Sequence, residues 1–202
     1  MRIIEMKSEK KAILGGSFDP VHMGHINLFH SISTYTDITT LYVIPAFTSA
    51  FKQERKTASF SDRMAMLNCA LLDYADLYPF DDLSVVVSDV EGEKGGISYT
   101  SETIKALFPY LEDRGKVNFV IGDDILPSLD KWHDYEYLKT HVRFYCFKRE
   151  GSINTRLDAE VIYFDSPVTT ASSTMVREGL KSIVSPTVLE YIEENGLYKD
   201  SR

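Results

Sequence analysis

The sequence predicts an α/β protein built on a Rossmann-like, doubly wound parallel sheet, with a small helical part at its C-terminal end. Short apolar runs of strand length alternate with longer stretches of helix length. Alternation of this kind favours parallel strands joined by helical crossovers. In such sheets ligands bind beyond the carboxyl ends of the strands, where the strand order reverses. We therefore expect the functional site at the end of the first strand, where a glycine pair follows Ala12-Ile13-Leu14.

The expected strands are the apolar runs 11–14, 39–44, 83–87, 117–121, 142–147 and 161–163. The expected helices are 22–34, 61–73, 101–111, a short one near 124–129, 173–180 and 186–195. Asp19-Pro20 has the pattern of a cap followed by a proline in the first helical turn, which marks the start of the first helix. The remaining long segments, 46–59 and 89–98, are expected to be loops, and the second is expected to be mobile because it holds Gly92, Gly95 and Gly96.

The chain has 202 residues, a length that suits one domain with a real hydrophobic core. We expect a single unit over 1–202, with a polar N-terminal extension at 1–10 and a C-terminal helical part at 171–202. The composition, 44% apolar and 26% charged, is that of an ordinary globular protein. Cys69 and Cys146 lie in apolar contexts, so they are expected to be buried thiols and not a disulfide.

The net charge of −8 argues against a general nucleic-acid binder, which normally has a basic patch. It does not argue against binding ATP, because local side chains and helix ends set the field at a site. The polar start shows no signal peptide and no apolar run approaches transmembrane length. We therefore expect a cytoplasmic protein with no membrane partner; a homo-oligomer is left open.

Residues 15–25 read Gly-Gly-Ser-Phe-Asp-Pro-Val-His-Met-Gly-His, which suits the binding of a nucleoside triphosphate. Gly15 and Gly16 can adopt backbone angles that other residues avoid, and without a Cβ they let a phosphate approach the main chain. A helix that begins here directs free N–H groups and a positive dipole end at an anion. His22 and His25, three positions apart, share one face of that helix.

Gly24, between the two histidines, keeps that face clear of bulk. Each part of the string has an ordinary explanation, since a glycine pair is usually a turn and a single histidine is usually structural. Two histidines at this spacing could also ligate zinc, but no cysteine or third histidine lies at metal-site spacing. The ordered combination of all these residue types favours the phosphate site.

A second pattern, Ala-Ser-Ser-Thr-Met-Val-Arg, occupies residues 171–177. Three hydroxyl side chains in a row suit a helix N-terminus, where they cap free N–H groups or hold phosphate oxygens. Arg177 lies one turn inside the helix, where its guanidinium could reach a triphosphate. Alone, this pattern is more simply an ordinary capped helix with a surface arginine.

The two patterns together resemble the Gly-Gly-x-Phe-Asp-Pro-x-His-x-Gly-His and Ile-Ser-Ser-Thr-x-x-Arg motifs of the nucleotidyltransferase superfamily, with Ala171 in place of isoleucine. The resemblance extends from about residue 11 to Lys199 and is closest to the bacterial nicotinate-nucleotide adenylyltransferases. The further matching segments are Ile44-Pro45 with Lys52, Ser61-Asp62-Arg63-Met64-Ala65-Met66-Leu67, Ser98-Tyr99-Thr100 with Thr103, Ile121-Gly122-Asp123-Asp124 with Leu129 and Trp132, and Pro186 to Tyr198.

The resemblance implies an enzyme of NAD biosynthesis that moves the adenylyl group of ATP to nicotinate mononucleotide, giving nicotinate adenine dinucleotide and pyrophosphate. It implies Mg²⁺ bound mainly through ATP, with no protein cage for a metal. The implied catalytic residues are His22, His25 and Arg177. The implied ATP-binding residues are Gly15, Gly16, Ser17, Phe18, His22, Gly24, His25, Gly122, Asp124, Ser172, Ser173, Thr174 and Arg177. The implied residues for the mononucleotide are Asp19, Lys52, Tyr99, Thr100, Trp132 and His133.

The sequence departs from the family pattern in places. Ala50-Phe51 replaces the usual Pro-His before Lys52, which puts that loop's histidine contact in doubt. Glu102 replaces the usual Asp, and Arg149-Glu150-Gly151 stands where Arg-Pro-Gly is common. Trp132 could be an ordinary packing residue, although its polar neighbours place it at an edge where a flat pyridine ring would stack.

Two other functional classes remain open at this stage. One is a sister transferase with a different phosphorylated acceptor, such as nicotinamide mononucleotide or phosphopantetheine. The other is a non-catalytic nucleotide sensor on the same fold. Pyrophosphate release from ATP with and without each acceptor distinguishes the three.

Overall fold

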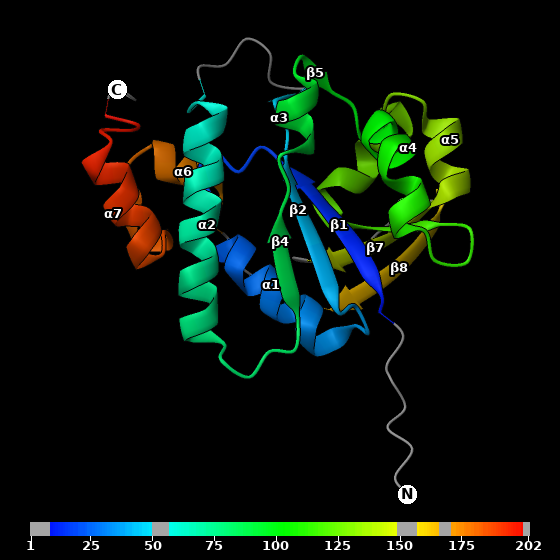
Figure 1. Ribbon diagram of the computed structural model, residues 1–202, viewed down its shortest axis with the longest axis horizontal. Coiled ribbons are helices and arrows are strands. Elements are labelled where there is room, and N and C mark those ends of the chain that lie inside the picture. The colour runs from blue at the N-terminus through cyan, green and yellow to red at the C-terminus, as the bar shows by residue number, and fades with distance from the viewer. Residues whose placement is uncertain (1–8, 50–56, 149–156, 166–170, 200–202) are drawn as a thin grey trace, which may run out of the picture.

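The computed structural model describes residues 9–49, 57–148, 157–165 and 171–199 of the chain. Its central sheet has six strands in the order β4-β2-β1-β6-β7-β8, and all five pairings are parallel. The strands are β1 (Lys11–Gly16), β2 (Thr40–Pro45), β4 (Ser84–Val87), β6 (Val117–Gly122), β7 (Val142–Lys148) and β8 (Glu160–Asp165). Counted along the chain, this is the 3-2-1-4-5-6 order of a doubly wound Rossmann-type sheet. The predicted fold class (Figure 1) and its six strands are confirmed, and the order reverses between β1 and β6.

The central strands are apolar because both of their faces are covered. In β1, Ala12, Ile13 and Leu14 are all buried. Ala12 and Leu14 belong to one core cluster and Ile13 to the other, as the alternation of side chains along a strand requires. A strand that is buried on both faces reads as a continuous apolar run, which is why these strands were recognisable in the sequence.

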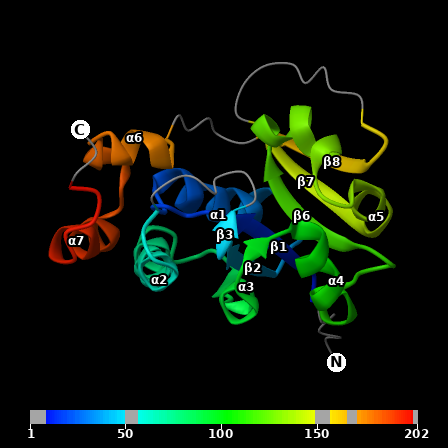
Figure 2. The same ribbon diagram turned by 90° about the horizontal axis from the view of Figure 1, so that it is seen from above.

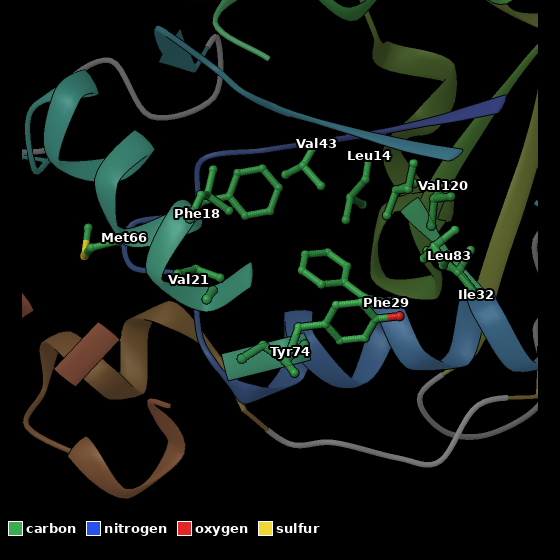
Figure 3. Packing of buried hydrophobic residues seen from close by; sticks show 14 of the residues in the cluster. Leu14, Phe18, Val21, Phe29, Ile32, Val43, Met66, Tyr74, Leu83 and Val120 are labelled. Atoms are coloured by element: carbon green, nitrogen blue, oxygen red, sulfur yellow. The ribbon is translucent and has the colours of Figure 1, made fainter. Parts of the chain in front are cut away.

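Helices form a layer on each face of the sheet (Figure 2). Helices α1 (Met23–Tyr35) and α2 (Phe60–Leu77) supply the first core cluster, and α4 (Thr100–Leu111) and α5 (Tyr135–His141) supply the second. The rings of Phe29 and Tyr74 meet edge to face in the first cluster, with centroids 5.6 Å apart, beneath Leu14 of β1 (Figure 3). Phe29 is fully buried.

The C-terminal part lies beside α2, on the side of the first cluster (Figures 1 and 2). It consists of α6 (Ser173–Arg177), the short 3₁₀ helix η2 (Lys181–Ile183) and α7 (Pro186–Glu194). Val176, Val188 and Ile192 from these segments belong to the first core cluster. This part therefore shares its hydrophobic core with the sheet.

The first helix begins later than expected. Helix α1 starts at Met23 with His22 as its N-cap, so the interpretation of Asp19-Pro20 as its cap is wrong. The helix expected over 173–180 ends at Arg177, just before Gly179, whose φ of +104° is not helical. Helix α5 was not predicted.

The segment 89–98 is not a loop, which corrects a second expectation. It contains α3 (Val90–Lys94) and β5 (Ile97–Ser98), and β5 pairs with β3 (Thr48–Ser49) in a small parallel sheet. Gly92 lies inside α3, and a Cβ at this position would come within 2.3 Å of the Phe60 ring. Gly92 is thus needed for close packing between helices. Of the other expected loop, residues 50–56 lie outside the described part of the chain.

Both cysteines are free thiols, as predicted, but only Cys146 is buried, whereas Cys69 is half-buried and not buried as expected. Burial raises the pKa of Cys146 to about 12 and also raises the pKa of Cys69, so both thiols are protonated at neutral pH. Within the described ranges, no helix combines the length and hydropathy that a membrane span requires.

Candidate active site

A cavity of about 390 Å³ opens where the strand order of the sheet reverses. Gly15, Gly16 and Ser17 line it from the end of β1, and Asp124 lines it from the segment after β6. Thr100 and Trp132 also line it. The cavity therefore brings the first sequence pattern next to the segments expected to hold the second substrate.

Gly15 and Gly16 are needed for space, not for unusual backbone angles. A Cβ on Gly16 would lie 2.9 Å from the Phe18 ring, and one on Gly15 would lie 3.1 Å from the Phe119 ring. Both glycines are ordinary strand residues, so the expectation of special angles is wrong. The left-handed backbone falls instead on Phe18, at φ +47°.

His22 and His25 lie side by side at the start of α1, with ring centroids 4.0 Å apart. Nδ1 of His22 accepts a hydrogen bond from the backbone N–H of Gly24 at 3.1 Å. Nδ1 of His25 accepts one from the backbone N–H of His22 at 3.2 Å. The two side chains thus form a reciprocal capping box at the helix N-terminus.

This capping fixes the protonation pattern of both rings. A ring nitrogen that accepts a hydrogen bond has no proton, so each neutral imidazole has its proton on Nε2. Each histidine can therefore act as a hydrogen-bond donor through Nε2, at a helix end whose dipole is positive. Such an arrangement suits the binding and stabilisation of phosphate oxygens.

The turn before His22 is held through the buried side chain of Asp19, which is 2% exposed. Asp19 Oδ1 accepts hydrogen bonds from the Ala58 N–H at 3.0 Å and from the Tyr198 hydroxyl at 2.7 Å. The Asp19 carboxylate therefore accepts hydrogen bonds from other residues of the same chain. Its direct contact with substrate stays a prediction. Sequence reasoning missed Tyr198, because no local pattern connects it to a residue so distant in the chain.

The second pattern packs directly on the first. Ser172 is the N-cap of α6, and its side chain accepts a hydrogen bond from the Met175 N–H at 3.3 Å. This confirms for Ser172 the prediction that hydroxyl residues of this pattern cap a helix. The Ser173 hydroxyl donates to the Pro20 carbonyl at 2.9 Å, which joins the two patterns.

Arg177 lies at the same junction and is 8% exposed. Its guanidinium donates to the Asp19 carbonyl and to Thr174 Oγ1, the latter at 2.9 Å. It also forms an ion pair with the Asp19 carboxylate at 3.7 Å. The predicted catalytic residues His22, His25 and Arg177 are therefore brought to one place by two distant segments.

The residues expected to hold the pyridine ring also meet. Tyr99 is the N-cap of α4, and its ring lies against that of His133 with centroids 4.4 Å apart. His133 Nδ1 is 3.0 Å from the Ser101 hydroxyl. Thr100, the first residue of α4, lines the cavity beside them.

Trp132 ends the 3₁₀ helix η1 (Asp123–Lys131) and lies edge-on to Phe119, with ring centroids 6.1 Å apart. It is partly buried and lines the cavity, as its polar neighbours predicted. Gly122 ends β6 and is the N-cap of η1, which places Asp124 at the cavity wall. Lys52 lies outside the described residues, so its role stays a prediction.

Arg63 of α2 is a second residue that sequence reasoning did not place in the site. Arg63 is 3% exposed, and its guanidinium donates to the carbonyls of Ser17, Ala46 and Phe47 at 2.9, 2.7 and 2.9 Å. Nε also donates to the Ala58 carbonyl at 3.3 Å. Burial lowers the pKa of Arg63, although Asp19 and Tyr198 act in the opposite direction. Its segment resembles a family helix, but nothing in the local pattern shows that it is buried.

Among the residues that the structure describes, no group of three or more His, Cys, Asp or Glu side chains could hold a metal.

Comparisons with known proteins agree with this geometry. Residues 13–179 match a protein-family model described as cytidylyltransferase-like. The chain is 34% identical over 197 residues to a "probable nicotinate-nucleotide adenylyltransferase" of Hydrogenobaculum, covering 94% of this chain and 98% of that protein. It is 31% identical over 194 residues to a protein of the same name from Enterococcus faecalis, covering 93% and 84% of the two chains.

Its fold is similar to that of a Plasmodium falciparum nicotinic acid mononucleotide adenylyltransferase solved with NaAD. The TM-score is 0.74 at 18% identity, covering 94% of this chain and 97% of that one. The match to the family model covers both motifs, and the similarity to the bacterial relatives runs over most of their length. The chain therefore belongs to the cytidylyltransferase-like nucleotidyltransferases and, within them, to the nicotinate-nucleotide adenylyltransferase family.

Proposed function

We propose that this enzyme transfers the adenylyl group of MgATP to nicotinate mononucleotide, releasing pyrophosphate and forming nicotinate adenine dinucleotide for NAD biosynthesis. The observation that supports this best is the junction of the two motifs beside the cavity. Arg177 contacts Asp19, and the paired histidines cap α1 at the same place. The names of the bacterial relatives identify the acceptor class.

ATP binds across the end of β1 and the start of α1. The N–H groups of the helix end and the Nε2–H groups of His22 and His25 stabilise the negative charge that develops on the α-phosphate. Arg177 and the hydroxyls of Ser172 and Thr174 hold the β- and γ-phosphates, while the Ser173 hydroxyl donates to the Pro20 carbonyl. Mg²⁺ arrives as part of the MgATP substrate, held chiefly by the triphosphate.

The chemistry needs positioning more than proton transfer. The nucleophile is a phosphate oxygen of the mononucleotide, whose second pKa of about 6 leaves it ionised at neutral pH. No general base is therefore required. The enzyme has to hold two anions in line and offset the charge on the leaving pyrophosphate.

The mononucleotide occupies the cavity. Its pyridine ring stacks on Trp132, and its carboxylate meets N–H donors near Thr100 and His133. Lys52 binds its phosphate. We place the reaction in the cytoplasm, with a homo-oligomer left open as the assembly.

The test is pyrophosphate release from ATP with nicotinate mononucleotide, nicotinamide mononucleotide, phosphopantetheine or no acceptor. We expect kcat/KM to favour the nicotinate over the nicotinamide compound by on the order of 10²-fold, because an amide leaves one N–H donor of the site unmatched. Comparable efficiency with both mononucleotides would place the chain in a nicotinamide or dual-specificity branch. A protein that releases no pyrophosphate in any of these four assays would be a nucleotide sensor.

Trp132→Ala provides the control for this selectivity. Stacking does not distinguish a carboxylate from an amide, so the variant should weaken both mononucleotides and preserve their ratio. If the variant lost the preference in kcat/KM for the nicotinate compound, Trp132 itself would be the residue that recognises the carboxylate.

A further inference from the structure

The C-terminal end of the described chain reaches into the turn that presents the catalytic histidines. The hydroxyl of Tyr198 donates to Asp19 Oδ1 at 2.7 Å, across 179 positions of sequence. Asp19 lies three residues before His22 and is almost fully buried. The contact therefore lies inside the molecule, next to the start of α1.

Asp19 joins three separate segments at this point. Its Oδ1 also accepts the Ala58 N–H at 3.0 Å, and its backbone carbonyl accepts a hydrogen bond from Arg177. The segment before α2, the second motif and the C-terminal end thus all converge on one residue of the first motif. A shift of Asp19 would shift the turn that leads into His22.

The backbone before this hydroxyl has two residues with left-handed conformation, Gly196 and Tyr198. Tyr198 has a φ of +60°, in the left-handed region that non-glycine residues disfavour, and Gly196 has a φ of +63° two residues earlier. Leu197 and the Tyr198 ring pack against the first core cluster. A conformation of this kind persists where the surrounding contacts determine it.

The charged groups around Asp19 are consistent with a neutral Tyr198 hydroxyl as its hydrogen-bond donor. Arg177 pairs with the Asp19 carboxylate at 3.7 Å, and Arg63 lies close enough for its pKa to be affected by Asp19 and Tyr198. Burial and the hydrogen bond to Asp19 raise the pKa of Tyr198, so its hydroxyl stays protonated. The hydroxyl therefore remains a donor throughout the physiological pH range.

We propose that Tyr198 is a positioning residue for adenylyl transfer, which holds Asp19 and through it the turn that places His22 and His25 against ATP. The C-terminal end of the chain thereby completes the active site. This inference rests on the proposed function for its kinetic consequence, but loss of the contact between Tyr198 and Asp19 should also affect nucleotide binding.

Tyr198→Phe removes the hydroxyl and keeps the ring. We expect kcat with MgATP and nicotinate mononucleotide to fall about ten- to hundredfold, since small displacements of reacting groups have effects of this size. The KM for the mononucleotide should change less than about twofold, because the cavity that holds it is lined by other elements.

Tyr191→Phe is the matched control. The Tyr191 hydroxyl lies on the same C-terminal part and also donates to a carboxylate, Asp62 Oδ1 at 3.0 Å, but this carboxylate belongs to α2 and not to the catalytic turn. The Tyr191→Phe variant should keep the kcat of the unchanged protein and have a melting temperature similar to that of Tyr198→Phe. A full kcat in Tyr198→Phe, or an equal loss of kcat in both variants, would overturn the proposal.

A double-mutant cycle separates positioning from general destabilisation. In an Asp19→Ala background, Tyr198→Phe should lower kcat less than about twofold further, because its only route to the reaction is gone. Fully additive losses would contradict the proposed route through Asp19.

Calorimetric binding of a non-hydrolysable ATP analogue tests the same contact without any acceptor. We expect Tyr198→Phe to weaken this binding several-fold and Tyr191→Phe to leave it unchanged. Unaltered analogue binding in Tyr198→Phe would overturn the inference even if adenylyl transfer were slowed. Failure of the proposed function would instead appear as an absence of pyrophosphate release in the unchanged protein, with the binding result still interpretable.

Discussion

At the scale of single residues, helix capping and catalysis use opposite sides of the same rings. Nδ1 of His22 and of His25 is occupied by a backbone N–H, which fixes each ring in place and leaves the proton on Nε2. The capping box is thus a positioning device as well as a helix start. It explains why the two histidines lie three positions apart, at the N-cap and N3 positions.

His25→Ala should lower kcat by roughly 10²-fold or more, the effect of removing one preorganised donor from a charge-stabilising site. Part of the helix cap is lost as well, at a cost of about 1 kcal/mol in the free energy of unfolding. Steady-state kinetics and urea unfolding measure the two effects separately. His30→Ala is the control, since His30 lies on the same helix but pairs with Asp81 at 3.0 Å outside the site. A His25→Ala variant that unfolds early yet keeps its turnover would assign His25 a structural role alone.

At the scale of elements, Arg63 shows what α2 contributes to the site. One guanidinium satisfies carbonyls from the first motif and from the segment that follows β2, so it fixes the two relative to each other. A lysine is a point donor without this planar fork and cannot reach all of these oxygens.

Arg63→Lys should therefore lower the free energy of unfolding by about 3 kcal/mol, since each buried polar group left without a partner costs about 1–3 kcal/mol. Urea denaturation provides the measurement. Arg114→Lys makes the same change at an exposed position and should stay within about 0.5 kcal/mol of the unchanged protein. Equal stability of the two variants would show that Arg63 is not the organising group of this junction.

Lys52 belongs to the segment 46–59, which the sequence predicts to be a loop, and its role is predicted from the sequence alone. Without a histidine before it, Lys52 is expected to provide the phosphate contact by itself. Lys52→Ala should raise the KM for the mononucleotide more than the KM for ATP, while Lys56→Ala removes the same charge nearby and should affect neither selectively. Equal effects of Lys52→Ala on both substrates, or none, would reject the assignment.

The sequence predicted the long elements well because their physical signals are local. Strands buried on both faces appear as apolar runs, and Ser172, the N-cap of α6, directly precedes the helix that it caps. Helix α3 and strand β5 were missed because five and two residues are too few to show a period, and Gly92 inside α3 resembles a loop residue. The roles of Arg63, Asp19 and Tyr198 could not be predicted, because their partners lie far away in the sequence.

At the scale of the whole molecule, the C-terminal part is joined to the sheet by both packing and hydrogen bonds. Val188 and Ile192 of α7 belong to the first core cluster. Tyr198, just beyond this helix, then bonds to the catalytic turn. Stability of the α2–α7 contact and geometry of the active site are therefore linked through one short stretch of chain.

Asp73 of α2 provides the sharpest test of that link. It is 7% exposed, and its carboxylate accepts hydrogen bonds from the backbone N–H of Thr187 at 3.1 Å and from the Thr187 hydroxyl at 2.6 Å. Thr187 lies in the first turn of α7, whose own N-cap, Ser185, makes no side-chain capping bond, so Asp73 caps α7 from the neighbouring helix.

Asp73→Ala should lower the free energy of unfolding by about 2 kcal/mol, the loss expected for a cap with a charged acceptor. Hydrogen exchange should speed up first in α7 and the segment up to Tyr198, because local opening follows the weakest contacts. Asp76→Ala removes the same charge from an exposed position of α2 and should change neither measurement. If Asp73→Ala accelerated exchange uniformly through the sheet and α7 alike, the C-terminal part would open only with the whole molecule. Its link to the catalytic turn would then be a consequence of global folding and not of a separate, adjustable contact.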